Sequence, residues 1–254
     1  MDATHQSDPR QAGRRLRRIS AGRLQRLLQG ARILEQDPHG IKVAQLPSGT
    51  ILKLFRRKRL LSSAAWRPYA LRFVDNARLL QQRAIPTVQI RSYLHCPQRA
   101  RHVVAYRPLP GQVLRDRLAQ GEAIDWRRVA AFVAGLHDSG VYFRSLHSGN
   151  VVCVHGGGFG LIDIADMRVF AKPLGLGRRV RNLRPLLRDP QMAPLREREV
   201  FGTFLEAYVE ATQWHGLGAS RLQALAWRRW SRFSRPRPAA GPGPVRPEAS
   251  DSHR

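Results

Sequence analysis

Residues 136–152 read Leu-His-Asp-Ser-Gly-Val-Tyr-Phe-Arg-Ser-Leu-His-Ser-Gly-Asn-Val-Val, and this stretch decides the fold. The segment before it has apolar residues at helical spacing, which predicts an amphipathic helix that Asp125 caps and that ends near Gly140. A polar loop then leads to two apolar runs around His155-Gly-Gly-Gly158, a pattern typical of a β-hairpin. The order is therefore a buried helix, a loop and a hairpin, and the chain beyond reads as helices to about residue 233.

The chain before this stretch is predicted to be rich in strands. Four strand-like runs and two helical patterns precede a break at the proline- and glycine-containing residues 107–111. A leading helix is expected from Ser20, with an apolar stripe that includes Ile33 and an end toward Gly30 or shortly after. The predicted elements are a hairpin of 41–46 with 50–55, a helix over 67–83, and strands over 88–93 and 102–106.

These elements predict an α+β fold with a small antiparallel β lobe and a mainly helical C-terminal lobe. Both ends of the chain are polar or proline-rich and are expected to be disordered. The predicted division is a disordered basic arm over 1–18, an N-terminal lobe over 19–106, a C-terminal lobe with the loop over 107–234, and a disordered tail over 235–254.

Two oxygen-bearing side chains follow the buried helix at a spacing that suits a metal site. Asn150 ends the polar loop, and Asp163 stands thirteen residues later at the end of the second strand of the hairpin, which is predicted over 159–164. A metal that bridges phosphates prefers hard oxygen ligands of this kind. The alternative for Asp163 is a turn or cap residue at a strand end. Asp166 is either a second ligand or a loop carboxylate.

Residues 136–152 resemble the catalytic loop of small-molecule and lipopolysaccharide kinases. The order of elements from about Leu34 to Leu187 resembles the protein-kinase fold, closest to the heptose and Kdo kinases of the lipopolysaccharide core and to bacterial chains labelled toluene tolerance proteins. The resemblance implies ATP and Mg²⁺ as cofactors, with Asn150 and Asp163 as metal ligands.

The same resemblance assigns nucleotide-binding roles to three residues of the predicted N-terminal lobe. Lys53 matches the strand lysine that grips the α and β phosphates, in a chain with only four lysines among 44 basic residues. The alternative is an exposed lysine that protects an edge strand. Asp75 stands where the partner glutamate of the lysine belongs, and Gly40 is the single glycine in place of a glycine-rich loop.

The chain departs from the family at the catalytic base. Counting back five residues from Asn150 places Ser145 at the position of the family's catalytic aspartate. A serine hydroxyl is a poor proton acceptor near pH 7, and loss of a general base typically costs about 10² to 10⁴ in rate. His147 lies where small-molecule kinases also carry a histidine, and its alternative role is an imidazole that packs the loop.

The formal net charge of +26 predicts an anionic partner, although a solvated arginine surface explains it equally well. Two basic clusters stand out: Arg56-Arg57-Lys58-Arg59, and a group of Arg178, Arg179, Arg181, Arg184 and Arg188 expected on one helix. The two cysteines, the lack of a signal sequence and the lack of a spanning segment predict a cytoplasmic protein. The resemblance to lipopolysaccharide kinases implies peripheral contact with the anionic inner membrane.

The function that these expectations combine to predict is an ATP-dependent kinase that acts on a lipopolysaccharide inner-core sugar. One alternative is a pseudokinase scaffold or regulator, because Ser145 replaces the base. Another is an atypical kinase that works beside RNA, because the chain is strongly basic. Nucleic acid ranks behind a lipopolysaccharide acceptor as the partner.

Overall fold

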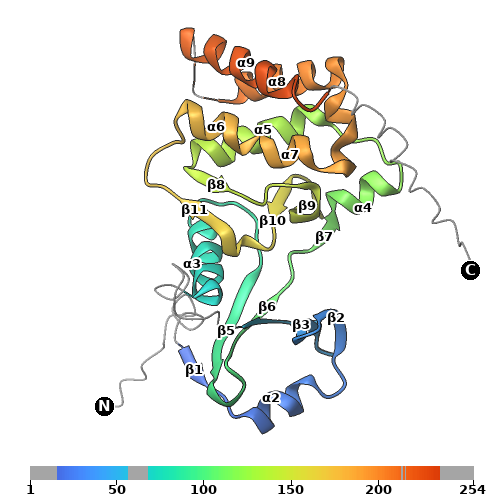
Figure 1. Cartoon of the computed structure of the whole chain (residues 1–254), viewed down its shortest axis with the longest axis vertical. Coiled ribbons are helices and arrows are strands. Elements are labelled where there is room, and N and C mark those ends of the chain that lie inside the picture. The colour runs from blue at the N-terminus through green and yellow to red at the C-terminus, as the bar shows by residue number, and fades with distance from the viewer. Residues whose placement is uncertain (1–15, 57–67, 213, 215, 235–254) are drawn as a thin grey trace, which may run out of the picture.

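The computed structural model describes residues 16–56, 68–212, 214 and 216–234, and it shows a mixed α and β protein (Figure 1). A six-stranded sheet occupies one end of the molecule and the helices α5 to α9 gather at the other, with α3 between them. No helix in these ranges combines the length and apolar character that crossing a bilayer requires.

The large sheet has the strand order β1-β5-β6-β4-β3-β2. The predicted hairpin is confirmed, because β3 and β4 pair antiparallel with Val43 opposite Lys53. Strand β1 joins the edge parallel to β5, whereas the other neighbours are antiparallel. The strands are β1 (Leu16–Arg18), β2 (Arg32–Asp37), β3 (Gly40–Gln45), β4 (Ile51–Arg56), β5 (Gln89–Cys96) and β6 (Arg101–Arg107).

The leading helix is shorter than its apolar stripe predicted. Helix α2 (Ala21–Leu28) begins as expected, because the Ser20 side chain accepts the Arg23 amide hydrogen bond. Its prediction was wrong at Ile33, which lies in β2 and pairs with Ala44. Gly30 adopts a left-handed conformation (φ +72°) that ends the helix and turns the chain into the sheet.

The ends of the chain fall largely outside the described residues. Of the predicted disordered arm, Leu16–Arg18 form strand β1, and the rest of the arm lies outside the described ranges. The predicted tail over 235–254 also lies outside them.

Helix α3 (Tyr69–Gln81) confirms the helix predicted over 67–83 and joins the sheet to the rest of the core. Its apolar face is fully buried, with Phe73, Ala77 and Leu80 in the main core. Asn76 on the same helix donates hydrogen bonds to the backbone carbonyls of Ile164 at 2.6 Å and Met167 at 3.2 Å. The helix is thereby fixed to the segment that follows Asp163.

The helical half also follows the predicted order, with several short elements added. Asp125 caps the buried helix by accepting from the Arg128 amide, and the hairpin β9–β10 is antiparallel. The second strand of the hairpin ends at Leu161, before the predicted 164. The elements are β7 (Gly111–Val113), α4 (Leu114–Ala119), α5 (Trp126–Asp138), β8 (Val141–Phe143), β9 (Val151–Val154), β10 (Phe159–Leu161), β11 (Met167–Val169), α6 (Leu176–Asn182), α7 (Arg184–Arg188), α8 (Arg198–Ala211) and α9 (Leu217–Trp230).

The histidine of the Leu-His pair is a core residue. His137 on α5 is fully buried, with Nδ1 at 2.6 Å from the Tyr208 hydroxyl and Nε2 at 3.2 Å from Asn182 Oδ1. Burial, with the nearby Arg179 charge, lowers the pKa of His137 to about 3. The imidazole is therefore neutral and joins α5 to α6 and α8.

This neutral histidine predicts acid-sensitive stability. An unfolded histidine has a pKa near 6.5, so between about pH 6.5 and pH 3 the unfolded state binds a proton that the folded state does not. The free energy of unfolding should fall by about 2 kcal/mol between pH 7 and pH 5 because of His137 alone. Urea unfolding at both pH values, for the native chain and His137→Gln, measures it. Equal pH dependence in the two proteins would contradict the assignment.

Candidate functional site

Four of the seven predicted site residues line one cavity of about 590 Å³. They are Gly40, Lys53, Ser145 and Asp163, which come from the large sheet and from the loops after β8 and β10. The volume lies within the range of small-molecule sites. Half of the remaining lining residues are charged, namely Glu35, Asp37, Lys42, Arg56, Arg101 and Asp166.

Lys53 forms an ion pair with Asp163 across this cavity. It lies on β4, which is hydrogen-bonded on both sides by β3 and β6, so it is not an edge-strand lysine. Its side chain is 18% exposed, whereas that of Asp163 is 52% exposed and faces the cavity. The Lys53 ammonium also lies within 6 Å of the rings of Phe55 and Phe73. The Lys53 ammonium thus lies against two aromatic rings and lines the cavity, where an anion can reach it.

Asp163 adopts an uncommon backbone conformation for a non-glycine residue, with φ +52° and ψ 43°. It directly precedes the short 3₁₀ helix Ile164–Asp166, but its side chain makes no capping hydrogen bond to that helix. The alternative of a simple cap residue therefore does not describe it. Left-handed backbone outside glycine is costly and is often retained at functional sites, where it directs a side chain.

The second carboxylate of the cavity belongs to Asp166. Its Oδ2 accepts a hydrogen bond from the Ser145 hydroxyl at 2.5 Å. Its Oδ1 is buried and has no hydrogen-bond partner among the described residues. A buried carboxylate oxygen without a partner is costly, which points to a proton or a cation as its missing partner. The sequence alone indicates Asp166 as a candidate site residue, since it follows Asp163 by three residues.

Asn150 contacts the backbone of the loop that carries Ser145 and is not among the residues that line the cavity. Its side-chain Nδ2 donates to the backbone carbonyl of Ser145 at 2.9 Å, and its own backbone carbonyl accepts from the Ile162 amide at 3.1 Å. Because the Ser145 carbonyl can only accept, the amide orientation is fixed, and Oδ1 remains the atom able to bind a metal. The backbone bond keeps Asn150 beside the strand end that carries Asp163.

His147 contacts Asn150 of the loop and Arg115 of α4, and it does not line the cavity. Its Nε2 lies 3.2 Å from Asn150 Nδ2, and its Nδ1 lies 3.5 Å from Arg115. Burial lowers the pKa of His147, and the nearby Arg115 charge lowers it as well. Nearby carboxylates, Asp189 first among them, act in the opposite direction but do not outweigh burial. Such contacts favour the packing alternative. The loop is further held at Ser148, whose amide and hydroxyl both donate to Asp189 Oδ2, at 2.7 and 2.5 Å.

The two remaining predicted residues sit differently in the fold. Gly40 opens β3 with φ +108°, and at this turn Arg101 donates to the His39 carbonyl at 2.5 Å. The turn thus stands at the cavity wall. Asp75 is buried in α3, 8% exposed, and does not line the cavity. Its role as the partner of Lys53 stays a prediction.

The oxygen donors at this site suit a magnesium ion that keeps water and phosphate ligands better than a metal ion whose ligands all come from protein side chains. No group of three His, Cys, Asp or Glu residues in the described ranges is placed to hold a metal. Mg²⁺ usually takes only one or two carboxylates and completes its shell with water and substrate phosphates. Asp163 and the amide oxygen of Asn150 are the donors that the described residues offer for such an ion.

The two basic clusters separate in the structure. Arg56 lines the cavity, and Arg57, Lys58 and Arg59 lie outside the described residues. The other five arginines were expected on one helix but fall on two, α6 and α7, because a new helix with Pro185 in its first turn begins at Arg184. Arg179 is fully buried against Asp138 and so is not a surface cation.

Comparison with known proteins gives likeness in structure only. No family model matches the chain, and no curated protein matches it in sequence. The bifunctional kinase-methyltransferase WbdD is similar over 75% of this chain and 42% of its own, with a TM-score of 0.41 and 18% identity. The crystal structure of WbdD at 2.2 Å is similar over 78% of this chain and 45% of its own, with a TM-score of 0.43 and 17% identity. Monomeric WbdD is similar over 70% of this chain and 42% of its own, with a TM-score of 0.42 and 15% identity. The chain therefore spans less than half the length of these proteins.

Proposed function

We propose that this chain is a kinase-like phosphotransferase that binds ATP and Mg²⁺ between a sheet-rich lobe, 19–106, and a helical lobe, 107–234. One observation carries the proposal: a single cavity joins the Lys53–Asp163 ion pair to the Ser145–Asp166 hydrogen bond. The first pair suits phosphates and their metal, and the second suits an acceptor hydroxyl. The resemblance in the sequence implies the same phosphate and metal roles for Lys53 and Asp163.

In the proposed site each cation and carboxylate has one task. Lys53 leaves Asp163 and binds phosphate oxygens, with Arg56 and Arg101 adding positive charge at the same wall. The carboxylate of Asp163 is then free for Mg²⁺, which neutralises charge on the phosphates when bound. The chain thus exchanges one internal ion pair for two contacts to the nucleotide.

The acceptor hydroxyl is placed at the Ser145 side of the cavity. Its oxygen forms the new bond to the γ-phosphorus as the bond from that phosphorus to the bridging oxygen of ADP breaks. The hydroxyl proton passes to Ser145 Oγ, whose own proton passes to Asp166 Oδ2 along the 2.5 Å hydrogen bond. Asp166 therefore supplies the carboxylate that the family carries at the position of Ser145.

The acceptor that we propose is a sugar hydroxyl of the lipopolysaccharide inner core, as the sequence resemblance implies. Acidic sugars suit the basic chain, whose net charge is +26. A nucleotide-binding pseudokinase is the second candidate, and the observation that favours it is Ser145 at the base position. Turnover of ATP with truncated lipopolysaccharide separates the two, since a pseudokinase binds nucleotide without transfer.

Nucleotide binding should stabilise the fold in a magnesium-dependent way. At about 100 times the dissociation constant, Mg²⁺–ATP should raise the free energy of unfolding by roughly 2.7 kcal/mol. Denaturant unfolding with ATP and EDTA, and then with ATP and Mg²⁺, measures the metal-dependent part. Asp163→Asn should abolish that part, whereas Glu35→Gln should retain it, because Glu35 lines the same cavity but pairs with Lys42. Stability indifferent to nucleotide in the native chain would overturn the proposal.

A further inference from the structure

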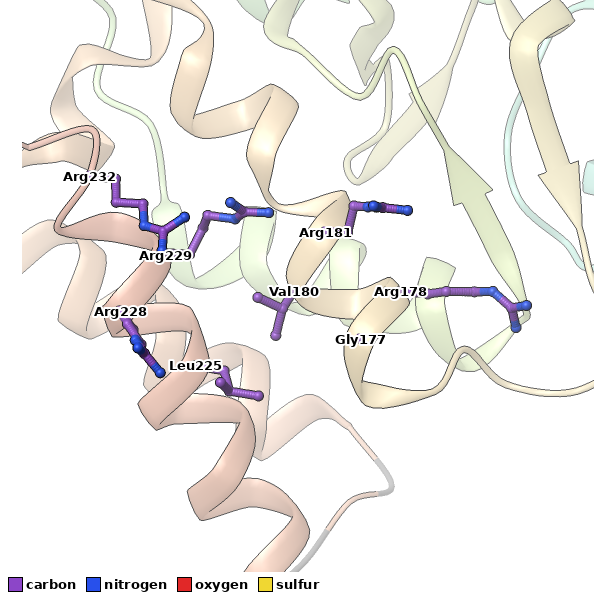
Figure 2. Close-up of a pocket in the computed structure, with 8 residues that line it drawn as sticks. All are labelled: Gly177, Arg178, Val180, Arg181, Leu225, Arg228, Arg229 and Arg232. Carbon is purple, nitrogen blue, oxygen red and sulfur yellow. The ribbon is translucent and has the colours of Figure 1, made fainter.

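A second basic feature lies away from the Lys53 cavity and shares no lining residue with it. Helices α6 and α9 lie side by side, and a groove of about 710 Å³ runs between them (Figure 2). We call it the arginine groove. The arginines that line it are Arg178, Arg181, Arg228, Arg229 and Arg232.

The arginines of this groove lack carboxylate partners within the described part of the chain. None of them takes part in an ion pair there, and no Asp or Glu lines the groove. Partial burial, together with the charges of Arg184, Arg232 and Arg181, lowers the pKa of Arg229. A guanidinium nevertheless stays charged at neutral pH, so the repulsion persists until an anion enters.

The positive surface continues past the groove. A neighbouring hollow of about 730 Å³ shares Arg178 and Arg181 with it. Four more arginines line that hollow, namely Arg144, Arg168, Arg184 and Arg188, and again no carboxylate does. The result is one broad cationic face rather than a single anion pocket.

The groove also has an aliphatic strip. Val180 of α6 and Leu225 of α9 point into the space between the helices, among the arginines (Figure 2). Leu225 is 39% exposed, one of the few large apolar side chains of the described residues left so open. Arginine heads around an apolar strip are the composition of surfaces that lie in the interface of an anionic bilayer.

Nucleic acid fits these observations less well. No aromatic ring lines the arginine groove, so a base has no flat face on which to stack. Two aromatic residues, Tyr142 and Phe170, line the neighbouring hollow, and the ring of Phe170 is already covered by the Arg178 guanidinium, 4.4 Å from its centroid. A phosphate next to an acyl chain matches both the charges and the exposed leucine.

We propose that the arginine groove and its neighbouring hollow dock the chain on a membrane leaflet rich in anionic phospholipid, with Leu225 entering the interface. Each arginine near such a leaflet contributes roughly fivefold to binding, so neutralising three should weaken partition about 100-fold. The inference does not depend on nucleotide binding in the Lys53 cavity.

Co-sedimentation with vesicles of phosphatidylglycerol and phosphatidylcholine, and with phosphatidylcholine alone, tests the proposal. The triple variant Arg181→Gln, Arg229→Gln, Arg232→Gln should lose about 100-fold in partition to the anionic vesicles. The matched control, Arg26→Gln, Arg78→Gln, Arg91→Gln, removes the same charge from exposed positions on the sheet-rich half and should lose far less. Equal losses in the two triples would show that net charge alone drives binding and would overturn the proposal.

Two further arms distinguish the source of the phosphate. Leu225→Ser should weaken vesicle binding roughly tenfold, because an apolar side chain no longer enters the interface. The soluble headgroup glycerophosphoglycerol should compete only weakly. Strong competition by free headgroup or by single-stranded RNA, with no effect of Leu225→Ser, would assign the groove to a soluble polyanion instead. Thermal unfolding of each variant confirms that the fold is intact.

Discussion

Asp166→Asn should lower the rate of phosphate transfer by about 10²- to 10³-fold while leaving the affinity for Mg²⁺–ATP within a few fold. The substitution keeps an oxygen that can accept from Ser145 but removes the charge that draws the proton. Ser145→Ala should cost less, because water in the cavity can replace the hydroxyl. Single-turnover rates with saturating nucleotide, and separate binding measurements, provide the two readouts. A rate unchanged in Asp166→Asn would contradict the relay.

Ser145→Asp supplies the opposite test. In most enzymes a carboxylate restored at the base position should raise the rate, but here it would meet Asp166, whose Oδ2 is 2.5 Å from the serine hydroxyl. Two carboxylates in contact cannot both be ionised near neutral pH, so the pKa of one rises. We therefore expect Ser145→Asp to be slower than the native chain, and Ser145→Asp combined with Asp166→Asn to be faster than the single variant.

The parts of the site that the sequence predicted are those fixed by local pattern. Lys53 lies in a hairpin strand, and Asp163 follows a hairpin, so short-range periodicity placed both correctly. Chain spacing could not show that they would pair across 110 residues. That pairing depends on α3, where Asn76 holds the segment after Asp163.

The parts that the sequence did not predict depend on non-local contacts. Strands β8 and β11 have three residues each and pair across the loop that carries Ser145, which brings this loop to Asp166. Such short strands carry no usable periodicity. Strand β2 was missed because its Ile33 continued a helical apolar spacing, although the helix was expected to end toward Gly30, where the left-handed backbone does end it.

Arg179 shows why counting basic residues misleads. It was counted in a basic cluster that was expected either to meet an anionic partner or to form a solvated arginine face, yet its side chain is fully buried, with an ion pair to Asp138 at 2.5 Å. It also donates to the Leu174 carbonyl, the Tyr208 hydroxyl and the Thr212 hydroxyl, at 2.7 to 3.1 Å. Three of these four bonds join α6 to the end of α5 and to α8 with its C-cap, and the fourth holds the segment before α6. Its role is to hold the helical half together.

Asp138→Ala should lower the free energy of unfolding by about 3–5 kcal/mol, because it leaves the buried Arg179 cation without its counter-charge. Arg179→Met should cost less than Asp138→Ala, since Asp138 is partly exposed and can be hydrated, whereas Arg179 cannot. Urea unfolding at pH 7 measures both, with the exposed Arg181→Gln as a matched control that should change stability by under about 0.5 kcal/mol. The double variant Asp138→Ala, Arg179→Met should be more stable than Asp138→Ala alone, because no unpaired buried charge remains. If the double variant instead loses the sum of both single effects, the two residues act independently and the buried pair does not organise this half of the molecule.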